Sequence, residues 1–255
     1  MKEQRQLRNE IRSVQSTKTL RNAAGLLFVA LATLTACGSD APPGDDQPGA
    51  ADQPLLPWAV GNTWTYRVTE DGAVSDKTTT VMEKTTVGGD GALKDTEAYF
   101  VVTKKGADQK DKTESYQAPD PMEPDRVLRY RELSYGAMTG LLQLEEYWVP
   151  PRIHADGSQL SKQSWVDAYT EFKLPAGEQP SPGAETHDLW VVLSTDEAID
   201  TPSGHFAHAV HLQKTGGSVK EYWYVRGVGK VRETGGQTEE LVSYHLETSI
   251  NALTK

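Results

Sequence analysis

Cysteine is nearly absent from this sequence of 255 residues, which contains only Cys37. An internal disulfide needs two cysteines and thiolate metal sites use several, so this chain forms neither. The folded part must therefore be held together by an apolar core. At this length, one β domain or two small ones bury enough apolar surface to be stable.

Basic residues are scarce relative to acidic ones. The chain has 26 Lys and Arg against 36 Asp and Glu, which gives a formal net charge of −10. Nucleic acids and anionic lipid surfaces attract basic protein faces. The composition therefore argues against nucleic-acid binding and against a broad basic surface that lies on a membrane.

The sequence also lacks the motifs of common enzyme classes. It contains no Gly-x-Ser-x-Gly nucleophile elbow. The glycine pairs at 216–217 and 235–236 lie between expected strands, so no phosphate-binding loop is predicted. Glu145-Glu146 and Glu239-Glu240 are adjacent pairs, and adjacent strand residues face opposite sides, so neither is an acid/base dyad. We predict no catalytic residue, no cofactor and no enzyme activity.

Three histidines, His205, His208 and His211, form the one cluster of a metal-ligating residue type. On a strand, His205 and His211 share a face but lie about 20 Å apart, at ~3.3 Å per residue. His208 points to the other face. Ligands that do not converge cannot bind one ion, so the sequence predicts no metal site.

The first 36 residues have the three parts of an export signal. A cationic segment contains six basic and two acidic residues, an apolar run covers 23–34, and small residues lead up to Cys37. About a dozen apolar residues are too few to span a bilayer, which needs about 20. Leu34-Thr35-Ala36-Cys37 resembles the bacterial lipobox. This resemblance implies that the cysteine receives a diacylglycerol and that residues 1–36 are a lipoprotein signal peptide.

Removal of the signal peptide leaves a lipid-anchored, strongly acidic chain. The peptide takes six positive and two negative charges with it, so the net charge changes from −10 to about −14. Two or more acyl chains on Cys37 make a stable anchor. Gly38 stands where enterobacterial lipoproteins retained at the inner membrane have aspartate. We therefore expect an outer-membrane lipoprotein that faces the periplasm or the cell exterior.

Residues 37–54 consist of the lipidated cysteine followed by a segment with no large apolar side chain. Such a segment has nothing to bury, so we expect a flexible tether that spans roughly 20–25 Å on average. The ordered domain is expected over residues 55–255.

Alternation of apolar and polar residues dominates that domain. Trp64, Tyr66 and Val68 alternate with polar residues, and Asp71-Gly72 is a hairpin signal directly behind them. The expected strands cover about 63–69, 77–87, 96–104, 112–117, 126–134, 143–149, 164–174, 187–194, 196–200, 206–214, 219–226, 229–233 and 239–248. One short helix is expected at 139–144. The pattern predicts an all-β fold of antiparallel strands in one domain.

Several stretches resemble a family of Gram-negative, notably myxobacterial, lipoproteins that consist of a lipobox, a polar tether and an all-β domain. The shared motifs are Gly-Asn-x-Trp-x-Tyr, Pro-x-Gly-x-Phe and Gly-Val-Gly, found here within 57–66, 201–206 and 222–231. Further matching stretches lie at 129–132, 169–171 and 240–244. The resemblance implies a single curved antiparallel sheet that forms a half-barrel, which we prefer, or a barrel. The family has no agreed activity, so the resemblance implies no catalytic residue.

The glycines of these motifs fit the geometry of a curved sheet. Gly204 and Gly227 allow backbone conformations that a Cβ disfavours. Gly229 is expected at a bulge or at a close approach between strands. Trp64 and Trp223 are large enough to form the core, or else they line a concave face.

One region combines basic and aromatic residues in an otherwise acidic protein. Arg129 and Arg131 are expected on one strand face, opposite Tyr130. The region is either a salt-bridged sheet exterior, which contributes little stability, or a recognition face for an anionic or glycan partner. The candidate binding residues are Arg129, Arg131, Tyr147, Trp148, Trp64 and Trp223.

Three functions stay open at this point. We prefer a non-enzymatic envelope lipoprotein whose curved sheet binds a hydrophobic molecule or another envelope protein, for which a spacious, mostly apolar concave face is required. The second is a structural or assembly partner with a filled core. The third and least favoured is a hydrolase with two carboxyl groups roughly 5–10 Å apart in a cleft.

Overall fold

The first strand follows the alternation in its sequence. In the computed structural model, which describes residues 51–247, β1 (Thr63–Glu70) buries Trp64, Tyr66 and Val68. Asp71 and Gly72 have positive φ angles of 48° and 80° and form the tight turn into β2 (Ala73–Thr86). The predicted alternation and the predicted hairpin are both confirmed.

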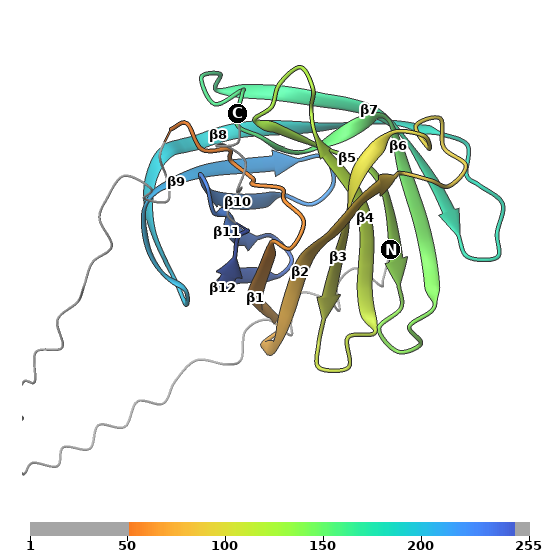
Figure 1. Cartoon of the computed structure of the whole chain (residues 1–255), viewed down its shortest axis with the longest axis horizontal. Coiled ribbons are helices and arrows are strands. Elements are labelled where there is room, and N and C mark those ends of the chain that lie inside the picture. Colours follow the sequence, from red (N-terminus) through yellow and green to blue (C-terminus); the bar gives the residue numbers. More distant parts are fainter. Residues whose placement is uncertain (1–50, 248–255) are drawn as a thin grey trace, which may run out of the picture. The chain divides into compact units, whose positions relative to one another are not determined.

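Across residues 51–247, twelve strands form one antiparallel sheet (Figure 1). After β1 and β2 come β3 (Glu97–Lys105), β4 (Asp111–Pro119), β5 (Arg126–Tyr135), β6 (Leu142–Asp156), β7 (Ser164–Pro175), β8 (Ala184–Thr201), β9 (Gly204–Thr215), β10 (Lys220–Val225), β11 (Gly229–Thr234) and β12 (Thr238–His245). The predicted all-β antiparallel fold is confirmed. The two runs expected at 187–194 and 196–200 are one strand, β8.

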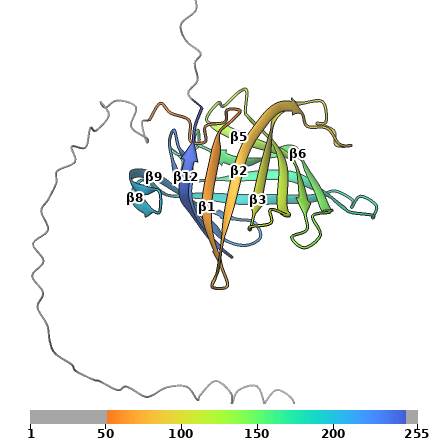
Figure 2. The same ribbon diagram turned by 60° about the horizontal axis from the view of Figure 1, so that its bottom comes forward.

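β1 is the strand that closes the sheet. It pairs with β2 on one side and with β12 on the other, where Trp64 lies opposite Tyr244 and Val68 opposite Glu239. Each remaining strand pairs with its neighbours in sequence, so the strands form an up-and-down barrel. Figure 2 shows β12, β1 and β2 side by side. The sheet therefore takes the barrel alternative, and the half-barrel preferred from the motifs is replaced by a closed barrel.

The short helix expected at 139–144 is wrong. Gly140 has a φ of +67°, and its amide donates to the carbonyl oxygen of Gly136 in the turn between β5 and β6. From Leu142 the chain pairs with β5, where Leu142 lies opposite Tyr135. Strand pairing outweighs the weak helical preference of so short a segment. Among the described residues, no helix is long and apolar enough to cross a membrane.

The hairpin of β8 and β9 bends toward β12 (Figure 1). Register shifts along β8 between residues 192 and 199 mark β-bulges, which bend a strand. At the tip of the hairpin, the amide of Ser203 donates to the carbonyl oxygen of Leu241 at 3.0 Å. Ile199 and Phe206 thereby join the buried cluster that contains Trp64 and Leu241.

Gly229 lies where two parts of the core come close together. Its φ is +102°, and a Cβ at this position would lie 3.0 Å from Leu56 Cδ1 and 3.3 Å from Trp64 Nε1. Trp64 is held here because its indole nitrogen donates to the carbonyl oxygen of Val228 at 2.6 Å. The predicted close approach at Gly229 is confirmed, and Gly204 and Gly227 have the expected positive φ.

The segment before β1 packs onto the barrel. The carbonyl oxygen of Pro54 accepts the amide of Gly227 at 2.9 Å, and that of Gln53 accepts Arg226 Nη1 at 2.8 Å. Leu55 is fully buried, and its amide donates to Asp125 at 2.7 Å. Gln53 and Pro54, which the sequence places in the tether, are thus bound to the domain. The predicted lipobox, Cys37 and the predicted signal peptide lie outside the described residues.

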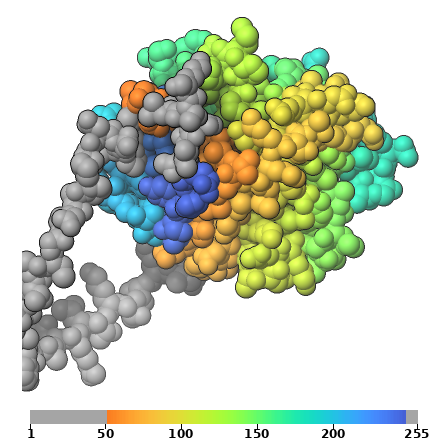
Figure 3. Space-filling view, viewed as in Figure 1, coloured from red at the N-terminus to blue at the C-terminus, as the bar shows by residue number. Residues whose placement is uncertain are grey.

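The segment between β2 and β3 covers part of the outer surface, where Figure 3 shows it in yellow. Val87, Ala98 and Tyr130 form a small buried cluster beneath it. Ideal Cβ atoms at Gly89 and Gly91 would meet the side chains of Arg131 and Tyr147, respectively. This segment therefore covers β5 at Arg131 and β6 at Tyr147.

Candidate functional site

The interior of the barrel contains a partly open cavity of about 470 Å³, here called the inner cavity. Its walls come from the segment before β1, which contributes Leu56 and Trp58, and from most of the strands. The aromatic lining residues are Trp58, Trp64, Tyr66, Trp190, Tyr222 and Tyr224. Hydroxyl and amide groups come from Thr79, Thr103, Thr113, Ser115, Gln117 and Gln237. The volume lies within the usual range for small-molecule sites, about 300–1,000 Å³.

Charged side chains line this cavity as densely as aromatic ones. Among the described residues, seven basic side chains line it: Lys77, Lys105, Arg129, Arg152, Lys214, Lys220 and Lys230. Four acidic side chains do so: Asp111, Glu132, Glu233 and Glu239. The balance inside the barrel is thus the reverse of the balance over the whole chain, which carries a formal net charge of −10.

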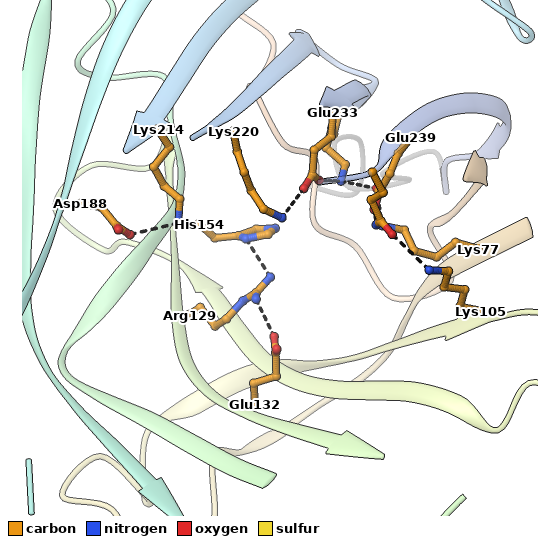
Figure 4. A network of polar contacts seen from close by, with 12 residues as sticks. Lys77, Lys105, Arg129, Glu132, His154, Asp188, Lys214, Lys220, Glu233 and Glu239 are labelled. Carbon is orange, nitrogen blue, oxygen red and sulfur yellow. Dashed lines mark hydrogen bonds and ion pairs between the residues drawn. The ribbon is translucent and has the colours of Figure 1, made fainter. Parts of the chain in front are cut away.

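Lys230 is the centre of a buried ion-pair network on β11 and β12. Figure 4 labels its two carboxylate partners, Glu233 and Glu239. Its Nζ contacts Glu233 and lies 2.7 Å from Glu239, which also binds Lys77. Burial alone would lower the pKa of Lys230, but the two carboxylates outweigh it, so this pKa lies well above its ordinary value. For Glu233 and Glu239, burial alone would raise the carboxyl pKa values. The attraction of Lys230 outweighs this effect, so both pKa values are lowered.

This network argues against acid/base catalysis by the closest carboxylates in the cavity. Glu233 and Glu239 both contact one ammonium group, which places them near each other as a glycosidase pair requires. Their lowered pKa values keep both ionised at neutral pH. A general acid must hold a proton at the working pH. Neither carboxyl group therefore supplies the proton for bond cleavage.

A second carboxylate pair lies in the sheet between β7 and β8. Asp167 is directly opposite Asp188, and both are nearly fully buried. Burial, together with the charge of Asp188, raises the pKa of Asp167 although the amide of Ile153 donates to it. Asp188 accepts hydrogen bonds from Lys214 Nζ at 3.1 Å and from the Tyr169 hydroxyl at 3.2 Å. Neither aspartate lines the inner cavity, so this pair holds neighbouring side chains in place.

Two arginines face each other across β5 and β6. Arg129 lies directly opposite Arg152, and both line the inner cavity. Arg129 donates through Nη1 to Glu132 at 2.5 Å and contacts His154 Nδ1 through Nη2 at 2.9 Å. Arg152 stacks over Trp148 and Tyr169 at 4.9 and 5.9 Å from their ring centroids. Within residues 51–247, no carboxylate lies within ion-pair distance of Arg152.

His154 is neutral because it is buried and because the charges around it are positive. Burial lowers its pKa well below 6.5, and the positive charges of Arg129, Lys230 and Arg152 lower it further. A neutral imidazole accepts through one nitrogen, so Nδ1 accepts the hydrogen bond from Arg129. Trp58 stacks on the other side, with 6.3 Å between ring centroids.

Four buried polar atoms of the inner cavity have no hydrogen-bond partner within the described chain. They are Trp58 Nε1, Gln117 Oε1, Arg129 Nε and Trp190 Nε1. Gln117 and Trp190 are 2% and 1% exposed. Leaving such a group unpaired costs about 1–3 kcal/mol. Three of the four atoms are donors, and all four are covered by neighbouring atoms of the protein.

The six residues predicted as a binding face do not form one site, although Arg131, Tyr147 and Trp148 lie together beneath the segment between β2 and β3. Arg129 and Trp64 line the inner cavity, whereas the remaining four do not. Arg131 donates to Glu145 at 2.9 Å and to the carbonyl oxygen of Val87 at 3.0 Å. Tyr147 stacks on Phe172 with 4.8 Å between ring centroids.

Two of the predicted tryptophans serve packing. Trp148 is 1% exposed and donates to Glu171 at 3.2 Å. Trp223 donates to Glu197 at 3.0 Å and stacks on His211 with 3.9 Å between ring centroids. Neither indole opens on the inner cavity.

The expectation that Arg129 and Arg131 share a strand face is wrong. A register shift between these two residues leaves Tyr130 without a partner on β6. An extra residue in a strand reverses the inside–outside alternation beyond it. Arg129 therefore lies in the inner cavity while Arg131 lies under the segment between β2 and β3.

Most residues of the inner cavity were missed from the sequence. The sequence signal for this cavity was a charged residue on the same strand face as a buried apolar residue. Glu239, for example, is two residues before Leu241, and both are buried. Lys77 likewise lies opposite the buried Tyr66. Charged residues at such positions indicate a polar interior.

The histidines of β9 each have their own carboxylate. His205 contacts Asp200 at 2.8 Å, and His208 contacts Asp196 at 2.7 Å. His211 contacts Glu197 at 2.9 Å and Glu221 at 3.1 Å. In the part of the chain that the structure describes, no group of three or more ligating side chains is arranged to hold a metal ion.

No protein-family model matches this chain, and no curated protein matches it. A Bacteroides fragilis protein inferred to be exported, with a YmcC-like fold, matches 76% of this chain and 100% of its own at 12% identity and a TM-score of 0.43. A protein of Parabacteroides distasonis inferred to be a lipoprotein matches 76% of this chain and 99% of its own, at 12% identity and a TM-score of 0.39. At these values, neither structure assigns a function to this chain.

Proposed function

We propose that the protein is a lipid-anchored envelope protein that binds a small, water-soluble ligand in its inner cavity without catalysing a reaction. The observation that carries this proposal is the polar wall of the inner cavity, which holds eleven acidic and basic side chains and six hydroxyl or amide side chains. Polar groups away from bulk water are normally paired. A ligand with its own polar atoms would provide hydrogen-bond partners for this wall.

The polar lining favours a polar ligand over the hydrophobic ligand that we preferred from the sequence. That hypothesis required a mostly apolar concave face, and the cavity wall instead carries eleven ionisable acidic and basic side chains besides His154. Hydrocarbon placed against ionised groups removes their solvation without providing hydrogen bonds or an opposite charge. A ligand with hydrogen-bonding groups fits this wall far better.

Attachment to the membrane rests on the N-terminal sequence. The lipobox at 34–37 and the polar stretch after it support lipidation at Cys37, and Gly38 supports an outer-membrane destination. The acidic mature chain is repelled by anionic lipid, so the anchor supplies the attachment. Held in this way, the barrel would sample ligands from the aqueous side of the membrane.

Native mass spectrometry of the full-length lipoprotein tests the proposal. The protein would be extracted gently from envelopes in a nonionic detergent without a sugar headgroup. We expect an added mass that disappears on denaturation and belongs to a polar compound. A bare protein mass would contradict the proposal and favour the alternative, an assembly partner that works through its outer surface.

Two adjacent residues of β3 provide a matched pair of variants. Thr103 lines the inner cavity, and Val102 lines a groove on the outer surface of β1 to β4. Thr103→Phe fills the cavity, so the added mass should be lost, whereas Val102→Phe should retain it. Circular dichroism would confirm that both variants are folded. Retention of the ligand by Thr103→Phe would place it elsewhere.

A further inference from the structure

The Arg129–Arg152 pair is an arrangement that a sheet normally avoids. Like charges directly opposite each other on antiparallel strands are destabilising. Here the two guanidinium groups share the inner face of β5 and β6. Glu132 pairs with Arg129 alone, and Arg152 has no ion-pair partner among residues 51–247. The pair therefore carries more positive charge than its neighbours neutralise.

The same two residues have unused hydrogen-bond donors. Arg129 uses Nη1 and Nη2, while its buried Nε has no partner in the described chain. Within residues 51–247, Arg152 has stacking contacts but no hydrogen-bond or ion-pair partner, so no acceptor of the described chain uses its planar fork. A guanidinium fork matches the geometry of carboxylate and phosphate groups. The two side chains thus provide charge and donors for one oxyanion.

Neighbouring groups respond to the same positive field. Burial, followed by the charge of Arg152, lowers the pKa of Lys214 even though Asp188 opposes the shift. His154, next to Arg129, is neutral for the same reasons. An anion in the cavity would relieve this repulsion.

The other residues of the cavity wall indicate the chemistry of the rest of the ligand. Trp190 stacks between Trp165 and Tyr222, at 5.8 and 5.7 Å, and its indole N–H has no partner within residues 51–247. Trp58 packs edge-on against Trp64 at 5.3 Å and also has an unpartnered N–H. Hydroxyl and amide side chains line the same cavity. A sugar ring presents apolar C–H faces to aromatic rings and hydroxyl groups to such donors and acceptors.

A fatty acid does not fit the same wall. Its carboxylate would match the arginines, but its chain needs an aliphatic surface. Of the residues that line the inner cavity, only Leu56 and Ile153 are aliphatic.

We propose that the ligand is a mono- or disaccharide carrying a carboxylate or phosphate group, and that Arg129 and Arg152 together bind this acid group. This inference rests on the proposed function, because it names the ligand class of the inner cavity. The acid group lies between the two guanidinium groups, and the sugar ring lies against Trp58, which is only partly buried. Binding forms no covalent bond.

Tryptophan fluorescence and calorimetry on the full-length lipoprotein, in a polyoxyethylene detergent, test the inference. The probes are glucuronate, galacturonate and glucose 6-phosphate, with glucose as the neutral sugar and inorganic phosphate as the free oxyanion. We expect at least one acidic sugar to bind about tenfold or more tightly than glucose, since hydrogen bonds to charged groups contribute about 1.5–3 kcal/mol. Phosphate should bind more weakly than that sugar.

Two arginine variants separate recognition from folding. Arg152→Gln should weaken binding of the acidic sugar about tenfold or more and leave glucose binding unchanged. Arg131→Gln removes an arginine paired with Glu145 outside the cavity, so binding should not change. Equal loss in both variants, or no loss in Arg152→Gln, would overturn the assignment of the acid site.

The outcomes distinguish this inference from the function on which it rests. Glucose binding as tight as the acidic sugars would refute the anionic ligand, and phosphate binding as tight as the sugars would refute the sugar. A polar added mass in native spectra without binding of any probe would refute the acidic sugar and leave ligand binding in place. No added mass and no binding would refute both.

Discussion

Lys230 and Glu239 form a buried ion pair inside the barrel, with 2.7 Å between the ammonium nitrogen and a carboxylate oxygen. The Glu239 side chain is only 2% exposed. The same lysine contacts Glu233, so one cation joins β11 to β12 through two buried carboxylates. This is the part of the barrel next to its closing strand pair, β12 with β1.

Replacing this lysine should destabilise the barrel strongly. Lys230→Met removes the cation shared by two buried carboxylates, and breaking a buried pair costs about 3–5 kcal/mol. We expect the lower part of that range because Lys77 and Lys220 still contact Glu239 and Glu233. Urea unfolding followed by circular dichroism measures the change. Lys105→Met is the control: its partner Glu70 is 53% exposed, so the loss should be within about 1 kcal/mol.

The free energy of unfolding should fall in acid because Glu239 becomes protonated. Burial raises the pKa of this carboxyl group, but Lys230 and Lys77 lower it by more, so the folded-state pKa lies below the ordinary value of 4.5. The resulting stabilisation is complete above the unfolded-state pKa and is lost as pH falls through the folded-state pKa. The free-energy difference between the wild type and Glu239→Gln should therefore shrink below about pH 4.5. A difference that stays constant from pH 7 to pH 3 would contradict the ionised pair.

Lys77 should react as an amine near neutral pH. Burial and then the charge of Lys230 lower its pKa to about 8, although Glu239 opposes the shift. Acetylation by a small anhydride, followed by peptide mass spectrometry, should show half-maximal reactivity at about pH 8. Lys230 provides the internal control, because its pKa is raised and it should stay unmodified over the same range. Reaction of Lys77 only above pH 10 would contradict this environment.

A methyl group at Gly229 should cost more than one at Gly236. Both glycines have positive φ, +102° and +90°, where a non-glycine residue costs about 1–2 kcal/mol. At Gly229 the Cβ would also press on Leu56 and Trp64, whereas nothing lies within 4 Å at Gly236. Overpacking adds typically about 1–3 kcal/mol. Thermal unfolding of Gly229→Ala and Gly236→Ala compares them directly, and equal losses would refute the close approach.

Lipidation should depend on Cys37 alone. Cys37→Ser removes the only thiol in the chain, so the protein should lose acyl labelling and leave the membrane fraction. Metabolic labelling with a fatty acid and fractionation of the envelope measure both effects. Membrane association of the serine variant would mean that another part of the chain provides the attachment.

Sequence patterns predicted the structure correctly where a feature depends only on residues close together in the chain. The alternation around Trp64, the Asp71-Gly72 turn and the tight position of Gly229 all appear in the structure as predicted. The patterns failed where hydrogen bonding to a neighbouring strand determined the conformation. The segment at 139–144 follows β5 into the sheet instead of forming a helix, and the bulge at Tyr130 separates Arg129 from Arg131.

The amino-acid sequence by itself determined the class of fold, because side-chain alternation and turn residues are local properties of the chain. It also carries Leu34-Thr35-Ala36-Cys37, whose resemblance to a lipobox can be seen in the linear sequence. Only the tertiary structure decided that β1 meets β12 and closes the sheet, since that pairing joins residues more than 160 positions apart. Closure then brought Arg129, Lys230 and Trp190 to one cavity, because the wall of a barrel is assembled from alternate residues of strands that are distant in sequence.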